Sequence, residues 1–333
     1  MPTPAEDHRS LVWGLIGDGR PLLALSGTAL FLSGAFGILQ SLSGFLLPHD
    51  SAAIGMDAAA LSHAGNQHLL HFMFHDRTAY CGTLLAIGSA YWWLAEFPLK
   101  IGREWAWWAF AISGATGFLS FLAYLQYGYL DTWHACATLL LLPTFLIGLL
   151  RSRACLNGPI SIRRAWSKPP KNEISIVKWG RFLLAACAAG LILAGTTIIV
   201  FGMTVVFVPQ DLAFMQLSRG QLQLISPMLI PVIAHDRSGF GGGLLSTGLL
   251  IAIIVRNAAL TRSFLEVIAL MGFFGFGAAL GVHFAIGYLD FTHLAPAYAG
   301  LILYLVGFAL CFGGRFRTVT GEQDRRLLFL LRR

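Results

Sequence analysis

Charge is scarce in this chain of 333 residues: only 12% of the residues are Asp, Glu, Lys or Arg, whereas 56% are hydrophobic. A soluble domain carries about 25% charged residues, so the composition excludes an ordinary soluble fold and indicates an integral membrane protein. The net charge of +7 does not point to a nucleic-acid partner, because the basic residues lie between hydrophobic runs. That arrangement is typical of a membrane topology signal.

Cysteine is also scarce, and none of the five cysteines falls in a loop expected to face the outside. This distribution excludes a disulfide framework and favours small packing residues. The first hydrophobic run is too long for a cleavable signal peptide, and no clear cleavage site follows it, so we expect it to stay as a membrane span.

Eight charge-free runs are long enough to cross a bilayer, which takes about 20 apolar residues. They are Pro21–Leu47, Thr78–Ala95, Trp105–Leu130, Thr132–Leu150, Phe182–Gln210, Ser238–Val255, Val267–Leu289 and Phe291–Gly314.

The positions of Lys and Arg predict the orientation of these spans. Of the 23 basic residues, only Arg77, Arg219 and Arg237 fall on one side, together with seven acids, and the other basic residues fall on the opposite side. We therefore expect both termini in the cytoplasm, with the chain in a bacterial or archaeal cell membrane among lipids.

Three motifs of the first half return in the second half after 159 to 161 residues. Their order and spacing make chance repetition improbable, and they indicate an internal repeat. The paired motifs are Pro48-x-Asp50 with Pro209-x-Asp211, His75-Asp76-Arg77 with His235-Asp236-Arg237, and Gly128–His134 ("GYLDTWH") with Gly287–His293 ("GYLDFTH").

The repeat predicts an all-α membrane protein of eight transmembrane helices, built as two parallel four-helix bundles. Units of four spans enter the membrane in the same direction, so a pseudo-twofold axis along the membrane normal relates them. The expected divisions are residues 1–150 for the first unit, 151–181 for a basic cytoplasmic linker, 182–314 for the second unit and 315–333 for a basic tail.

Long loops between the first two spans of each unit, residues 48–74 and 209–234, are expected to be partly structured. Pro231 suggests that the following helix starts nearby, which places His235 about one turn inside it. The run "GFGGG" from Gly239 to Gly243 lacks the context of a phosphate loop, and it favours close contact between helices.

Each unit offers two histidines from different helices at similar depth, His75 with His134 and His235 with His293. Two imidazoles from opposite walls of a bundle suit a six-coordinate haem iron. The neighbouring charged residues have expected roles: Arg77 and Arg237 anchor propionates, and Asp131 and Asp290 orient imidazoles.

This layout resembles the haem A synthase family, in which two tandem four-span bundles carry a histidine on the second and fourth span of each. The resemblance implies haem ligation by the four histidines and an oxidoreductase with a lipophilic substrate or quinone. Phe72 stands where that family has its catalytic glutamate, three residues before the first histidine, so the resemblance implies a sister family rather than the same activity.

Three alternatives remain open from the residues alone. The imidazoles and carboxylates, including Asp50 and Asp76, also suit a non-haem metal. A purely structural network would pair Arg77 with Asp76 or Asp131, and Arg237 with Asp236 or Asp290. A transporter or binding protein without a cofactor would place the two His-Asp-Arg triplets face to face across the pseudo-twofold axis, as an outward-open polar site. Asp211 and Asp236 are further candidate site residues.

Two further histidine features belong to one half only. His283 has Tyr124 as its counterpart in the first half, and it is a candidate proton relay or substrate contact, with a packed structural histidine as the alternative. His68, His71 and His75 follow helical spacing, which superficially resembles a desaturase histidine box without the further boxes that such enzymes need.

Overall fold

The computed structural model describes residues 12, 16–122, 128–129, 132–158, 160–164, 166 and 173–330, with side chains given throughout except at 121, 122, 133, 134, 137, 164 and 317–330. Within these ranges the chain is helical and contains no strand. The prediction of an all-α protein is therefore confirmed.

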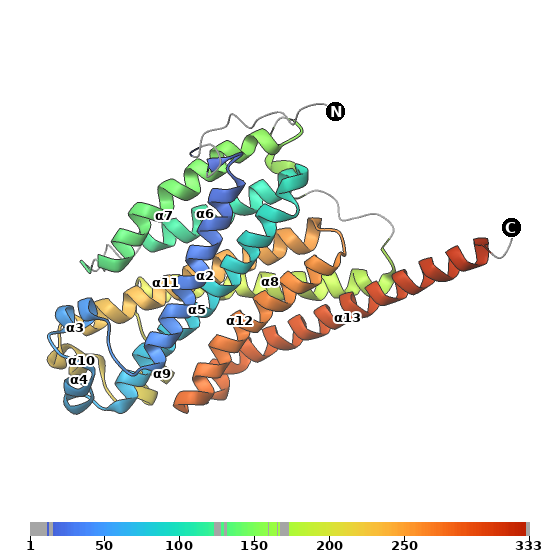
Figure 1. Ribbon diagram of the computed structural model, residues 1–333. Helices are drawn as coiled ribbons and strands as arrows, with labels where there is room; N and C mark the ends of the chain where they lie inside the picture. The colour runs from blue at the N-terminus through green and yellow to red at the C-terminus, as the bar shows by residue number, and fades with distance from the viewer. Residues whose placement is uncertain are drawn as a thin grey trace.

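Within the described residues, eight long helices form the body of the molecule, and four short ones lie at one end (Figure 1). The long helices are α2 (Arg20–Leu42), α5 (Gln67–Glu96), α6 (Glu104–Leu122), α7 (Thr132–Arg151), α8 (Ser175–Gly202), α11 (Leu229–Asn257), α12 (Arg262–Ile286) and α13 (Phe291–Leu330). The short helices, called the cap helices below, are α3 (Pro48–Ile54), α4 (Ala58–Ala64), α9 (Pro209–Met215) and α10 (Arg219–Ile225). Short 3₁₀ turns at Leu99–Ile101, Ser152–Cys155 and Ile162–Arg164 complete the described structure.

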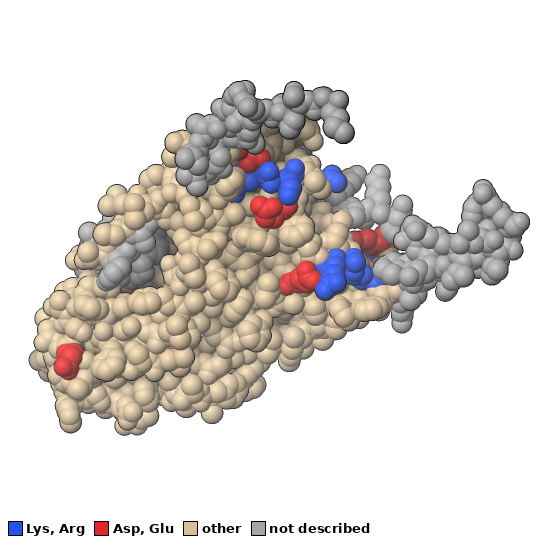
Figure 2. All heavy atoms as spheres, in the orientation of Figure 1, with Lys and Arg blue, Asp and Glu red and all other residues tan. Residues whose placement is uncertain are grey.

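Six helices of the described chain are long and apolar enough to cross a membrane, namely α2, α7, α8, α11, α12 and α13. On the face in Figure 2, most of the visible Lys and Arg side chains gather at the end opposite the cap helices, and the long middle of the molecule is free of charge. Both observations agree with a multi-pass membrane protein.

Helices α5 and α11 form the centre of the molecule. Two thirds (67%) of the apolar window of α11 is buried, against 22–33% for the other five candidate spans. Helix α5 packs against α2 and α12, whereas α11 packs against α8 and α6. Each central helix therefore contacts a helix from the other half of the sequence as well as one from its own half.

Small residues allow the central helices to approach their neighbours closely. A Cβ atom added at Gly241 would lie 2.7 Å from the backbone nitrogen of Ile199 in α8, and at Gly242 and Gly243 it would overlap Ser120 of α6 and Thr83 of α5. The prediction that the glycine run serves helix contacts is confirmed.

Local sequence signals set the ends of the central and cap helices. The side chain of Asn66 accepts a hydrogen bond from the backbone N–H of Leu69 and begins α5. Pro48 and Pro209 occupy the first positions of α3 and α9, where a missing N–H costs nothing.

The long loops are confirmed as structured, because they contain the cap helices. Helix α11 begins two residues before Pro231, which agrees with the predicted depth of His235. Helix α5 begins at Gln67, eleven residues before the charge-free run that starts at Thr78 (78 − 67 = 11). The reason is that the charged residues of this stretch are paired inside the protein, so the helix includes them.

Candidate functional site

Arg77 of α5 lies in a buried cluster of charges where the central helices meet the cap. Its Nη2 atom is 2.7 Å from Oδ2 of Asp50, in α3, and 2.9 Å from Oδ2 of Asp236, in α11. All three residues are at most 7% exposed. Arg77 thus binds one carboxylate from its own half and one from the other half.

Arg237 of α11 makes the reciprocal set of contacts. Its Nη1 atom is 2.6 Å from Oδ2 of Asp211, in α9, and its Nε atom is 3.1 Å from Oδ2 of Asp76, in α5. Nη1 also donates to the backbone carbonyl of Val206 at 2.6 Å. A buried network of charges therefore exists, but its partners differ from those expected: Arg77 binds Asp50 and Asp236, and Arg237 binds Asp211 and Asp76.

Burying such charges is expensive unless each one is paired and hydrogen-bonded. Two tyrosines supply further hydrogen bonds to this cluster: the hydroxyl of Tyr129 donates to Asp50, and that of Tyr288 donates to Oδ1 of Asp211 at 3.0 Å. Both belong to the repeated Gly-Tyr-Leu-Asp motif. These tyrosines were not predicted as site residues, although their repetition in both halves was the available signal.

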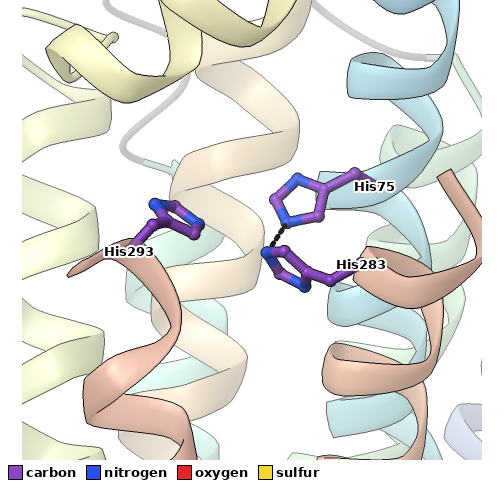
Figure 3. A group of neighbouring side chains, drawn as sticks. All are labelled: His75, His283 and His293. Carbon is purple, nitrogen blue, oxygen red and sulfur yellow. Dashed lines mark hydrogen bonds between the residues drawn. The ribbon is translucent and has the colours of Figure 1, made fainter. Parts of the chain in front are cut away.

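Three histidines gather beside this cluster (Figure 3). His75 comes from α5, His283 from α12 and His293 from the first turn of α13. One ligand nitrogen from each lies within 4.8 Å of the others, and Nε2 of His75 is 2.9 Å from Nε2 of His283. His75 and His283 are 3% and 6% exposed, and His293 is partly buried.

Two of these imidazoles have their Nδ1 atom facing an oxygen atom. Nδ1 of His283 donates to the backbone carbonyl of Ala279 at 2.6 Å. Nδ1 of His75 is 3.3 Å from Oδ1 of Asp76, without the geometry of a full hydrogen bond. Both contacts favour the tautomer with hydrogen on Nδ1, assigned from the network, and this tautomer leaves a lone pair on Nε2.

The third imidazole, that of His293, also has its Nδ1 atom facing an oxygen atom, the hydroxyl of Tyr288. Because the Tyr288 hydroxyl gives its own hydrogen to Asp211, its oxygen is free to accept one from Nδ1 of His293, at 3.3 Å. Burial, together with the Asp211 carboxylate, raises the pKa of Tyr288, so the hydroxyl keeps its hydrogen near neutral pH. Nε2 of His293 is then also available as a ligand.

The other predicted haem ligands lie elsewhere or outside the described side chains. His235 is not part of the three-histidine group: its Nδ1 is 3.0 Å from Oδ1 of Asp236, and its ring meets the edge of Tyr129, 5.4 Å away. The side chain of His134 and the whole of Asp131 fall outside the part of the chain that the structure describes.

Asp290 acts at the start of α13. Its Oδ1 accepts from the backbone N–H of His293 at 2.8 Å and from the hydroxyl of Thr292 at 2.6 Å. These two hydrogen bonds lower the pKa of Asp290. Asp290 therefore fixes the backbone that carries His293.

Sequence reasoning singled out His283 but did not place it with His75. The signal was the presence of a histidine in one half and Tyr124 at the matching position of the other. The pairing was hidden because α12 packs on α5, a contact between the two halves that the repeat alone does not reveal.

No protein-family model, curated protein or solved structure matches this chain. The class that fold and site together define is a helical, multi-pass membrane protein with a buried ion-pair cluster and a group of three histidines.

Proposed function

We propose that this chain is a membrane metalloprotein in which His75, His283 and His293 bind one transition-metal ion. The proposal includes eight spans in two parallel units, with α5 and α6 added to the six apolar helices. It also includes a cell-membrane location with both termini in the cytoplasm. The reciprocal contacts of Arg77 and Arg237 support the twofold relation between the units.

The observation that carries the metal proposal is the 2.9 Å separation between Nε2 of His75 and Nε2 of His283. With hydrogen on both Nδ1 atoms, two lone pairs face each other at this distance, so a proton or a metal ion has to lie between them. Metal–imidazole bonds of about 2.0–2.1 Å, meeting at about 90–110°, separate two ligand nitrogens by about 2.9–3.4 Å. The observed distance falls at the lower end of that range.

The surroundings of the three histidines match those of known metal sites. A ligating histidine usually gives its second N–H to a carboxylate, a backbone carbonyl or another polar group, and this fixes the ring. Here the Ala279 carbonyl and the Tyr288 hydroxyl occupy two of those places, and Asp76 lies 3.3 Å from Nδ1 of His75 without a full hydrogen bond. Imidazole ligands suit zinc, copper, iron and nickel. When bound, such an ion would supply Lewis acidity or electron transfer.

Haem held by His75 with His134, and by His235 with His293, stays a prediction of the sequence. Axial nitrogens on haem iron lie about 4 Å apart with the porphyrin between them, whereas Nε2 of His75 faces His283 at 2.9 Å. Arg77 and Arg237 are also engaged by carboxylates, so anchoring propionates would require these ion pairs to open. Both observations support a metal ion over haem.

Transport or binding without a cofactor is the second candidate, and the meeting of the two triplets between the halves favours it. In that case the charged cluster would open to admit a polar solute. Every carboxylate of the cluster is at most 7% exposed, so this function requires a large conformational change.

Metal analysis of the protein purified in detergent, with oxidised and reduced absorption spectra, tests the proposal. We expect about one zinc, copper, iron or nickel ion per chain, and its loss in H75A and H283A. The variant H63A is the matched control, because His63 is an exposed histidine in α4. A sharp reduced α-band with a positive haemochrome assay would favour haem instead, and a colourless, metal-free protein would favour the transporter.

A further inference from the structure

The first turns of α5 carry a row of histidines that leads to the three-histidine group. His68, His71 and His75 lie at positions i, i+3 and i+7, so their side chains share one face of the helix. Neighbours at such spacings have Cβ atoms about 5–6 Å apart.

Burial increases along this row. His68 and His71 are partly exposed, whereas His75 is 3% exposed. The Nδ1 atom of His68 is buried and makes no hydrogen bond to any described residue. The row therefore runs from the cap end of α5 into the site, and it offers imidazole nitrogen at each step.

One aromatic ring lies beside the outer end of this row and reaches the three-histidine group through Tyr288. Phe214 of α9 meets the ring of His68 edge-on, with centroids 5.1 Å apart, and stacks on Tyr288 at 4.5 Å. Tyr288 in turn stacks on His293 at 4.6 Å. The side chain of Asn66 ties the start of α5 to the carbonyl of Met215 at the end of α9, so Phe214 is held beside His68.

We propose that His68 and His71 form the loading route by which a divalent metal ion reaches His75, His283 and His293, with Phe214 as the plug of that route. The inference rests on the proposed metal site. The ion moves by exchange of one neutral imidazole ligand for the next, so its oxidation state does not change. Water completes its coordination at the two outer positions.

This route differs from the binding site in its expected behaviour. His68 and His71 are not members of the three-histidine group, so they affect how fast the ion arrives and leave the equilibrium occupancy unchanged. Phe214 covers the route, so a smaller residue at this position speeds loading.

The test measures the rate at which the metal-stripped full chain, in detergent, takes up Co²⁺, followed by visible absorption. We expect the double variant H68A/H71A to load at least tenfold more slowly than the parent, with the same final stoichiometry. The variant F214A should load faster. H63A is the control for removing a histidine near the cap, and it should load at the parental rate.

The outcomes separate this inference from the proposed function. If the parent binds no Co²⁺ and no other divalent ion, the proposed metal site is wrong. If the parent binds Co²⁺ but H68A/H71A and F214A both load at the parental rate, the route is wrong and the site stands. A loss of stoichiometry in H68A/H71A would also overturn the route, because these histidines would then be ligands. The variant H68Q/H71Q, which keeps side-chain size, replaces the alanine variant if that one elutes as aggregate.

Discussion

The two copies of the His-Asp-Arg triplet agree at their arginines and differ at their histidines. Arg77 and Arg237 each bind one aspartate from the cap and one from the opposite central helix. His75 meets two further histidines, whereas His235 contacts the neighbouring Asp236 and the ring of Tyr129.

This difference shows that the ion pairs of the arginines have to be the same in both copies of the repeat, whereas the partners of the histidines can differ. A buried arginine that loses a partner leaves charges uncompensated in a low-dielectric interior, so both copies keep the full set of ion pairs. An imidazole is neutral in one of its forms and tolerates several partners. The histidine of one copy can therefore take other partners. In this protein His75 of the first triplet meets His283 of α12.

The largest expected effect is the loss of stability when one of the two buried arginines is replaced. Replacing Arg77 or Arg237 by Met leaves two buried carboxylates without their cation, and we expect each change to lower the free energy of unfolding by about 3–5 kcal/mol. Equilibrium unfolding in mixed detergent micelles measures this. Because the contacts are reciprocal, the two values should agree within about 1 kcal/mol.

Arg219 is the matched control for this pair. It is exposed and donates to the carbonyl of Val205, so R219M should change the free energy of unfolding by less than about 1 kcal/mol. Equal small losses in all three variants would show that the buried ion pairs are not what joins the halves.

The next prediction tests the part in which the triplets differ. H75A should weaken binding of the metal ion by at least about 100-fold, because it removes a ligand, while H235A should leave binding within about threefold. Titration of the metal-stripped protein with Zn²⁺ against a chromophoric chelator measures both. Equal losses in the two variants would instead favour a ligand role for both histidines, as in the haem prediction.

A smaller effect is expected where Gly241 allows α11 to approach α8 closely. Gly241 of α11 lies against Gly195 and Ile199 of α8, and G241V forces these helices apart, which we expect to cost about 1–3 kcal/mol. Gly190 of α8 has no neighbour within 4 Å of an added Cβ, so G190V is the control. Thermal unfolding of both variants checks the prediction, which fails if they melt together.

The smallest expected effect separates two roles of Asp290. As a helix cap it supports the first turn of α13, so D290A should lower the melting temperature slightly and leave metal affinity within about threefold. A direct role in orienting the imidazole of His293 predicts a loss of about 10–100-fold in affinity. A Zn²⁺ titration of D290A distinguishes the two roles.

Much of the fold follows from local signals in the sequence. Hydrophobic runs and the repeat predict an all-α membrane protein, and the two proline starts help to define the cap helices. The extended start of α5 could not be predicted from hydropathy, because His75, Asp76 and Arg77 look unfavourable until their partners are known. Those partners are up to 161 residues away along the chain.

The candidate site was predictable in its residue types and only partly in its grouping. Asp50, Asp211 and both triplets were singled out from the sequence, and their aspartates and arginines lie together in the buried charge cluster. The association of His75 with His283 and His293 depends on how α5 packs between α2 and α12. Neither periodicity nor motif spacing carries that information.

The contact between Asp76 and Arg237 also has a consequence for biosynthesis. The two residues are 161 positions apart, and a ribosome adding about 5–20 residues per second needs about 8–32 s to reach the second after the first. During that interval Asp76 has been synthesised and its partner Arg237 has not. In the proposed topology, in which α5 spans the membrane, Asp76 therefore needs a polar environment until α11 has been made.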